Sequence, residues 1–232
     1  MAFARGANVV TNGLVLCLDA ANPKSYISGS ATWFDLSGNG NHITLLNNPT
    51  YTNENNGGIT FNGSNQYGQS STIFTVPNQI TVMVVAKIAT SSSQNFTGIL
   101  HCGSGDFTNN GGNGFLVGYP DNVANTNIRM NYGSGSIMDA ISTPGPNSGS
   151  YMFLGYSVSA VSRSIQLNGT IFGNVARVSA NPTYSGSINV AVWSTYGRYF
   201  RGTLYAALMY NRGLSTDEML QNYNALKPRF NL

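Results

Sequence analysis

The sequence is short of charge. Charged residues make up 8% of the 232 positions, whereas ordinary soluble domains carry about 25%. The net charge is only +3, and the eleven Lys and Arg residues are scattered, without a basic run. The electrostatic footprint of a nucleic-acid-binding protein is therefore missing, and we expect no nucleic-acid partner.

Residues that commonly bind metals or form disulfides are also scarce. The chain has two cysteines, Cys17 and Cys102, and two histidines, His42 and His101. Both cysteines lie in apolar, strand-like segments at no metal-binding spacing, which predicts two buried thiols. A domain of this length buries enough surface to fold without a metal or a disulfide. We therefore expect no cofactor.

Long hydrophobic runs are absent from the sequence. The longest, Ile80–Ala89, is interrupted by Thr81 and Lys87 and is too short to cross a membrane. The first residues lack the charged-then-apolar pattern of a signal peptide. We expect no membrane association and production in a cytoplasm.

Small polar residues take the place of charge, with 30 Asn and 27 Gly. Both residue types favour turns, because they tolerate a positive φ. Between these turn signals lie many short apolar or alternating runs, which predict an all-β protein. Ile80–Ala89 is apolar on both faces, so we place it centrally in a sheet. The other expected strands are Leu14–Asp19, Gly58–Phe61, Tyr67–Ser70, Gly98–Cys102, Gly114–Gly118, Asn127–Tyr132, Tyr151–Ser159, Ser164–Leu167, Thr170–Gly173, Ile188–Trp193 and Gly202–Asn211.

Two local elements are strongly marked. Asn168-Gly169 stands between two alternating runs, and this pair best satisfies the two positive φ angles of a type I′ hairpin turn. Ser215 and Glu218 have the spacing of a capping box. The sequence therefore predicts a short C-terminal helix, which Pro228 ends.

The chain reads as one domain, residues 13–232, preceded by an N-terminal arm, residues 1–12. A frayed terminus is the commoner explanation for such an arm. However, Phe3, Val9 and Val10 are apolar, which a solvated tail seldom requires. Together with Arg5, they are the candidate partner-binding residues.

Several segments spread along nearly the whole chain carry a family resemblance: Gly13–Tyr26, Trp33–Asn41, Gly58–Tyr67, Leu167–Gly169 and Gly202–Glu218. In this order they resemble the laminin-G-like, concanavalin A-like lectin/glucanase family, and more closely its branch in structural proteins of tailed bacteriophages. The resemblance implies a two-sheet antiparallel jelly-roll sandwich with one short C-terminal α-helix. It is less specific for function, because one fold hosts many activities.

Catalytic groups are few. Glycosidases use two carboxyl groups about 5–9.5 Å apart, but the sequence has only two glutamates, Glu54 in an Asn-rich loop and Glu218 in the capping box. No paired acidic residues, nucleophile elbow or phosphate-binding loop is recognisable. From the sequence we expect a chain that is not an enzyme.

Two groups of residues have side chains suited to a ligand, one to calcium and one to a carbohydrate. Asp19, Asp35, Asn39 and Asn41 offer oxygen atoms of the type that calcium prefers. Turn hydrogen bonds explain the same residues more simply, so no metal site is assigned. The carbohydrate candidates are Trp193, Tyr196 and Tyr199, although Trp193 also suits the end of a core strand.

The expected function is that of a virion structural protein of a tailed bacteriophage, as a capsid decoration subunit assembled in the host cytoplasm. Its partners would be the major capsid protein or other virion proteins, and a homo-oligomer, with a trimer as the guess. The alternative is a carbohydrate-binding module of a tail fibre or tail tip that recognises host glycans.

Overall fold

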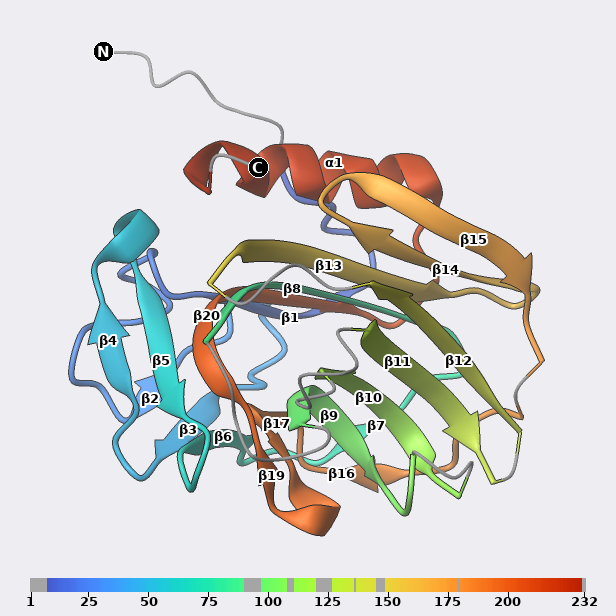
Figure 1. The fold of residues 1–232 in the computed structure, drawn as a ribbon, viewed down its shortest axis with the longest axis horizontal. Coiled ribbons are helices and arrows are strands. Elements are labelled where there is room, and N and C mark those ends of the chain that lie inside the picture. The colour runs from blue at the N-terminus through green and yellow to red at the C-terminus, as the bar shows by residue number, and fades with distance from the viewer. Residues whose placement is uncertain are drawn as a thin grey trace.

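The computed structural model describes residues 8–89, 97–107, 111–119, 127–135, 137–144, 149–178 and 180–230. Two large antiparallel sheets pack face to face, and one α-helix near the C-terminus lies on the outside (Figure 1). The predicted all-β jelly-roll sandwich with a short C-terminal helix is confirmed. Among the described residues, none of the helices has the length and apolar content that crossing a membrane requires.

The first sheet has eight strands, in the order β15-β14-β13-β8-β20-β5-β4, with β1 also paired to β20. Its strands are β1 (Leu14–Asp19), β4 (Thr50–Thr52), β5 (Gly58–Asn62), β8 (Ile80–Ile88), β13 (Tyr151–Val158), β14 (Ser162–Leu167), β15 (Thr170–Ala176) and β20 (Arg201–Tyr210).

The second sheet has ten strands, with β12-β11-β10-β9-β17-β6-β3-β2 as its main path. Its strands are β2 (Thr32–Trp33), β3 (Ile43–Leu46), β6 (Tyr67–Ser70), β9 (Thr97–Ser104), β10 (Asn113–Tyr119), β11 (Asn127–Ser134), β12 (Ile137–Pro144), β17 (Asn189–Val190), β18 (Val192–Trp193) and β19 (Arg198–Tyr199). A small two-stranded sheet joins β7 (Phe74–Thr75) and β16 (Ser185–Gly186).

Strand β8 is apolar on both faces because each face is covered. Val82 and Val84 point into the core between the sheets. Met83 and Val85 point outward into a second apolar cluster that includes Met219 of the C-terminal helix. The expected central position of this strand is confirmed, since β13 and β20 flank it.

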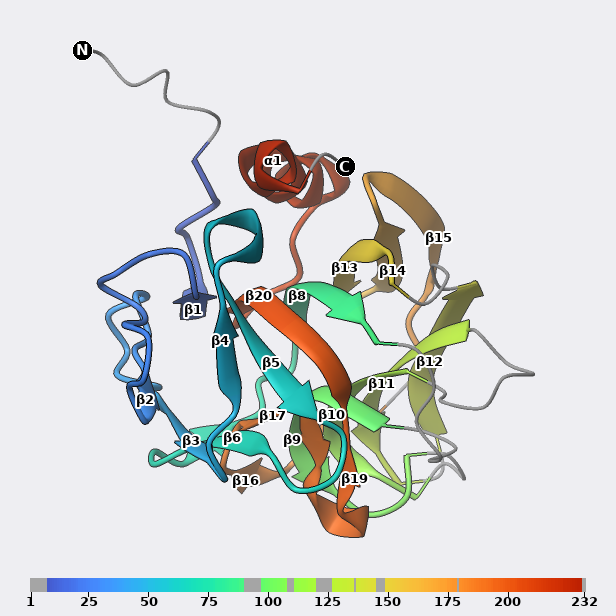
Figure 2. The same ribbon diagram turned by 60° about the vertical axis from the view of Figure 1, so that its left-hand side comes forward.

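The helix α1 (Thr216–Leu226) begins as the sequence predicts. The Ser215 hydroxyl accepts a hydrogen bond from the backbone N–H of Glu218 at 3.3 Å, and the Glu218 carboxylate accepts one from the backbone N–H of Ser215 at 2.9 Å. Met219 and Tyr223 are buried beneath the helix. These contacts hold α1 on the outer face of the eight-stranded sheet (Figure 2).

The Asn168-Gly169 turn also forms as predicted, with φ angles of +48° and +86°. Several strands escaped prediction, including β2, β3, β12 and β19, whereas β17 and β18 both lie within the expected strand Ile188–Trp193. The sequence predicts a long loop at Pro49–Gly57, but this segment contains β4 and the 3₁₀ turn η1 (Glu54–Asn56). β2 and β19 have two residues each and β3 has four, too few to show a clear alternating pattern. The eight residues of β12, Ile-Met-Asp-Ala-Ile-Ser-Thr-Pro, do not alternate strictly between apolar and polar.

Candidate functional site

An open pocket with a cavity volume of about 530 Å³ lies where β5, β8 and β20 meet. Below it is called the Glu54 pocket. Its described lining residues are Glu54, Thr60, Phe61, Asn62, Lys87, Ile88, Ala89, Gly149, Arg201, Gly202 and Thr203. Ligand pockets commonly have about this size, and they combine apolar walls with a few convergent polar groups.

Strand register builds one wall of the pocket. Thr60 pairs with Thr203, Thr203 pairs with Lys87, and Lys87 pairs with Tyr151. Residues directly opposite each other on neighbouring strands point to the same face of a sheet. The four side chains therefore form a polar row across β5, β20, β8 and β13, on the outer face that α1 leaves uncovered.

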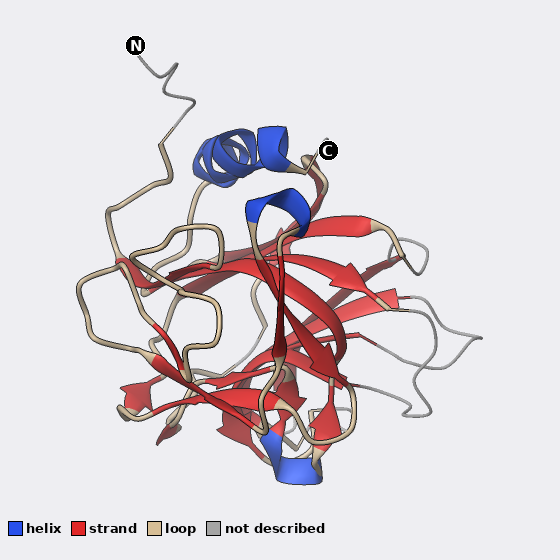
Figure 3. Cartoon of the chain, turned by 90° about the vertical axis from the view of Figure 1, so that its left-hand side faces the viewer, coloured by secondary structure: helices blue, strands red, loops and turns tan. Residues whose placement is uncertain are grey.

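The Glu54 carboxylate accepts hydrogen bonds from two members of this polar row and from one further tyrosine. Its Oε1 accepts hydrogen bonds from Lys87 Nζ at 2.6 Å and from the Tyr151 hydroxyl. Its Oε2 accepts a hydrogen bond from the Tyr205 hydroxyl at 3.0 Å. Glu54 is the first residue of the turn η1, which connects β4 and β5; Figure 3 shows the backbone of this short helical turn.

The charges of this cluster stabilise one another. The Lys87 ammonium and then the Tyr151 hydroxyl lower the pKa of Glu54, and the Glu54 carboxylate raises the pKa of Lys87. Burial, followed by the neighbouring Glu54 carboxylate, raises the pKa of Tyr205. At neutral pH the pocket therefore presents a carboxylate and an ammonium, and the buried Tyr205 that supports Glu54 stays a neutral phenol.

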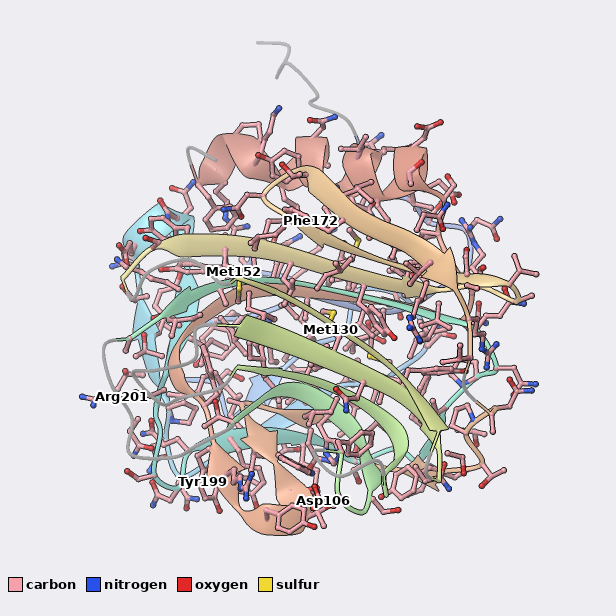
Figure 4. All side chains as sticks on the ribbon, turned by 45° about the vertical axis from the view of Figure 1, so that its right-hand side comes forward. Asp106, Met130, Met152, Phe172, Tyr199 and Arg201 are labelled. Atoms are coloured by element: carbon pink, nitrogen blue, oxygen red, sulfur yellow. The ribbon has the colours of Figure 1, made fainter. Side chains whose placement is uncertain are left out.

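The remaining polar groups of the pocket are hydroxyls, an amide and a guanidinium. Thr60 Oγ1 and Thr203 Oγ1 share a hydrogen bond of 2.8 Å. Asn62 and Arg201 pair at the adjoining end of β5 and β20, and the Arg201 side chain points outward into solvent (Figure 4). The arrangement offers donors and acceptors at several angles, which is what a ligand with several hydroxyl groups needs.

The lining residues that the structure describes do not include the carboxylate pair of a typical glycosidase. Glu54 is the one carboxylate among the lining residues that the structure describes. Asp19, the acidic residue that ends β1, is held by Arg229 through an Oδ1–Nη1 ion pair of 2.6 Å. What the described groups can do directly is bind a ligand by hydrogen bonds.

The carbohydrate candidates chosen from the sequence lie on a different surface. Trp193 is fully buried against Phe107, whereas the Tyr196 side chain is 45% exposed. The Arg198 guanidinium lies 5.1 Å from the ring centres of both Trp193 and Tyr196. Trp193 is therefore a core residue of the β18–β19 hairpin, and Tyr196 presents the accessible aromatic surface.

Tyr199, the third carbohydrate candidate, is half-buried and packs on Tyr67, with ring centres 6.0 Å apart. The structure thus brings Trp193 and Tyr196 together but gives Tyr199 a different aromatic neighbour.

The candidate arm residues are divided. Phe3 and Arg5 lie outside the described residues. Val10 is buried against α1, where its backbone N–H donates to Asn222 Oδ1 at 2.8 Å and its carbonyl accepts from the Tyr210 hydroxyl at 2.9 Å. Val9 packs beside it, half-buried. Residues 8–12 therefore lie on the sandwich rather than extending from it.

The oxygen-rich turn near Asp35 has the hydrogen bonds expected of a turn. Asp35 Oδ1 accepts from the backbone N–H groups of Cys17 and Ser37, and Asp35 Oδ2 accepts from the Ser37 hydroxyl and the N–H of Asn41. Within the described ranges, no group of three or more His, Cys, Asp and Glu side chains is placed to hold a metal ion.

Sequence reasoning missed the Glu54 pocket, although one signal was visible. Lys87 is the single charge within the apolar run Ile80–Ala89, and a charge in a central strand needs a partner. The partner, Glu54, is 33 positions away in sequence. Its identity depends on the strand order, which the run itself does not contain.

No family model matches the chain, and no curated protein matches it. Solved structures do share its fold. A Trypanosoma rangeli sialidase in complex with sialic acid gives a TM-score of 0.64 at 16% identity, over 93% of this chain and 33% of the sialidase. A mutant of the botulinum protein HCR/D gives a TM-score of 0.69 at 12% identity, over 93% of this chain and 52% of that chain.

This comparison corrects one expectation. The scarcity of catalytic motifs led us to expect a chain that is not an enzyme, and that exclusion is wrong, because sandwiches similar to this one occur in proteins named as sialidases. The chain spans about a third of the sialidase length, and identities of 16–18% show the fold alone. No enzymatic activity is established by them.

The fold part of the expected resemblance is supported, since both kinds of neighbour contain lectin-like β-sandwiches. The tailed-bacteriophage part finds no counterpart among these neighbours. The chain therefore has a two-sheet β-sandwich fold, consistent with a concanavalin A-like sandwich.

Proposed function

We propose that the chain is a carbohydrate-binding module and that the Glu54 pocket holds the glycan. One observation carries the proposal: a carboxylate, an ammonium and paired hydroxyls converge on an open pocket of about 530 Å³. Sugar hydroxyls both donate and accept hydrogen bonds, and the pocket presents both kinds of partner.

The polar groups are held in place before a ligand arrives. Glu54 is fixed by Lys87, Tyr151 and Tyr205, so little side-chain freedom is lost on binding. The sialidase neighbour crystallised with sialic acid supports the fold only, and the type of sugar is left to the experiment.

The test is a glycan array carrying neutral and sialylated sugars, followed by calorimetry with the best ligand. Replacing Lys87 with Met should weaken binding about tenfold or more, because a charge-assisted hydrogen bond is lost. Lys24→Met, in an exposed loop, is the matched control and should bind as the wild type does. Absence of array binding, or equal affinities of Lys87→Met and wild type, would contradict the proposal. The released sugars should also be analysed, since hydrolysis would add an activity to the binding.

A second proposal retains the virion role: a decoration subunit on the capsid of a tailed bacteriophage. The family resemblance and the charged fraction of 8% support it, because a low-charge surface packs closely without strong repulsion. Quantitative mass spectrometry of purified particles should then give a fixed ratio to the major capsid protein. A few copies per particle would indicate a tail position and favour glycan recognition.

A further inference from the structure

Exposed apolar side chains gather at one margin of the molecule. Among the described residues, eight large hydrophobic side chains are exposed, and four of them lie between positions 161 and 178. These are Val161, Phe172, Val175 and Val178, with exposures of 76%, 40%, 41% and 55%. Scattered exposed hydrophobic residues are ordinary, but a cluster on one element indicates an interaction surface.

This cluster lies on and beside an open strand edge. β15 is the last strand of the eight-stranded sheet, seven residues long, and all of its residues except Ile171 are exposed. Phe172 is paired with the core residue Ile165 and so points to the same face of the sheet, but on the edge strand it stays 40% exposed; Figure 4 labels it at β15. The opposite edge strand, β4, has only three residues. A long edge with apolar side chains invites pairing with another strand.

The hairpin geometry shows which backbone groups are open. Leu167 and Thr170 flank the two-residue Asn168-Gly169 turn and form its closing pair, which is a hydrogen-bonded pair. The next pair, Gln166 with Ile171, is then of the non-hydrogen-bonded type. The N–H and C=O groups of Ile171 therefore point away from β14, toward the open edge.

A β-bulge in the hairpin limits how many residues of β15 can pair with another strand. The register shifts between Arg163 and Ile165, and Gly173 has a φ of +56°. A bulge bends an edge strand and interrupts regular pairing. Thr170–Phe172 is the regular part, so pairing is restricted to these three residues, supported by the apolar side chains beyond them.

We propose that two copies of the chain pair antiparallel through β15, with the twofold axis at Ile171. The two Ile171 residues then exchange both backbone hydrogen bonds, and Thr170 of each copy faces Phe172 of the other. Such a contact is self-complementary, as a twofold interface must be.

Charge favours a second copy as the occupant. Residues 164–176 contain no charged side chain, so two copies meet there without like-charge repulsion. Arg163 and Arg177 lie at the end of the hairpin opposite the Asn168-Gly169 turn. In the antiparallel dimer, the arginines of one copy therefore lie far from those of the other. An acidic or basic partner peptide would find no matching charge along the strand.

Sedimentation velocity from roughly 10 to 500 µM tests the association, because a short ladder gives a weak, concentration-dependent dimer. The wild type should form dimers over this range. Phe172→Lys and Val175→Lys should each weaken dimerisation about tenfold or more. Ile73→Lys is the matched control, since Ile73 is 69% exposed but lies outside the hairpin, and it should dimerise like the wild type.

Residue-resolved hydrogen exchange identifies the surface. The Ile171 amide should exchange more slowly at the high concentration than at the low one, and this difference should vanish in Phe172→Lys. A wild type that stays monomeric at 500 µM, a trimer, or an equal loss of dimer in Ile73→Lys would overturn the proposal. So would unchanged exchange at Ile171 in a dimer.

Discussion

The two glutamates of this chain are each bound by a cation. Glu54 pairs with Lys87, and Glu218 pairs with Arg212, whose Nη2 lies 2.5 Å from Glu218 Oε1. Since the hydrogen bond from Arg212 lowers the pKa of Glu218 to about 2, folding favours the ionised form of this carboxyl group. A group whose pKa is lower in the folded state contributes stability above its unfolded pKa, and this contribution is lost as the pH falls through the folded pKa.

We therefore expect Glu218→Gln to lower the free energy of unfolding at pH 7 by about 1.5–3 kcal/mol, the range for a hydrogen bond to a charged group. The difference from the wild type should shrink between pH 4.5 and about 2, the ordinary and folded pKa values of Glu218. Urea unfolding at several pH values measures it. Asp217→Asn removes a charge from an exposed position in the same helical turn and should show a smaller change. A difference that stays constant from pH 7 to 2 would contradict this explanation.

At the scale of elements, α1 also holds the chain that precedes β1. Asn222 is fully buried; its Oδ1 accepts from the Val10 N–H, and its Nδ2 donates to the Tyr210 hydroxyl. Asn222→Ala should cost about 1–3 kcal/mol, because it leaves buried partners unsatisfied. It should also speed hydrogen exchange at Val10. Asn224 is exposed on the same helix, so Asn224→Ala should change neither the free energy of unfolding nor hydrogen exchange at Val10. If it behaves like Asn222→Ala, the effect comes from a change in the helix and not from loss of the Asn222 hydrogen bonds.

The β14–β15 hairpin offers a second prediction at this scale. Gly169 and Gly29 share a φ of +86°, but a Cβ on Gly169 would lie 2.6 Å from the Tyr223 ring, whereas a Cβ on Gly29 meets nothing within 4 Å. Gly29→Ala should cost about 1–2 kcal/mol from its left-handed backbone alone. Gly169→Ala should cost about 1–3 kcal/mol more, because the ring must move. Equal melting temperatures of the two variants would show that α1 shifts freely.

For the whole molecule, prediction from sequence succeeded where the signal is local. The capping box at Ser215, the Asn168-Gly169 turn and the apolar run around Val84 each contain their own evidence within a few residues. The Glu54 pocket has no such signal, because it depends on the order of β5, β20, β8 and β13. Likewise, the aromatic character of Trp193 is visible in the sequence, but its burial depends on Phe107 from a distant loop.

The labelling rates of the two thiols can show whether the sandwich unfolds as a single cooperative unit. Burial raises the pKa of both Cys17 and Cys102 to about 12, and the thiolate is the reactive form. At pH 8, labelling of the native protein should therefore be on the order of a thousandfold slower than labelling of the unfolded chain.

Cys102 lies in the core between the sheets and Cys17 on β1 of the eight-stranded sheet. If the sandwich opens as one unit, Cys17→Ala and Cys102→Ala variants should label at similar rates, each rising in parallel with urea. Faster labelling of Cys17 would instead show that β1 detaches from β20 before the sheets separate.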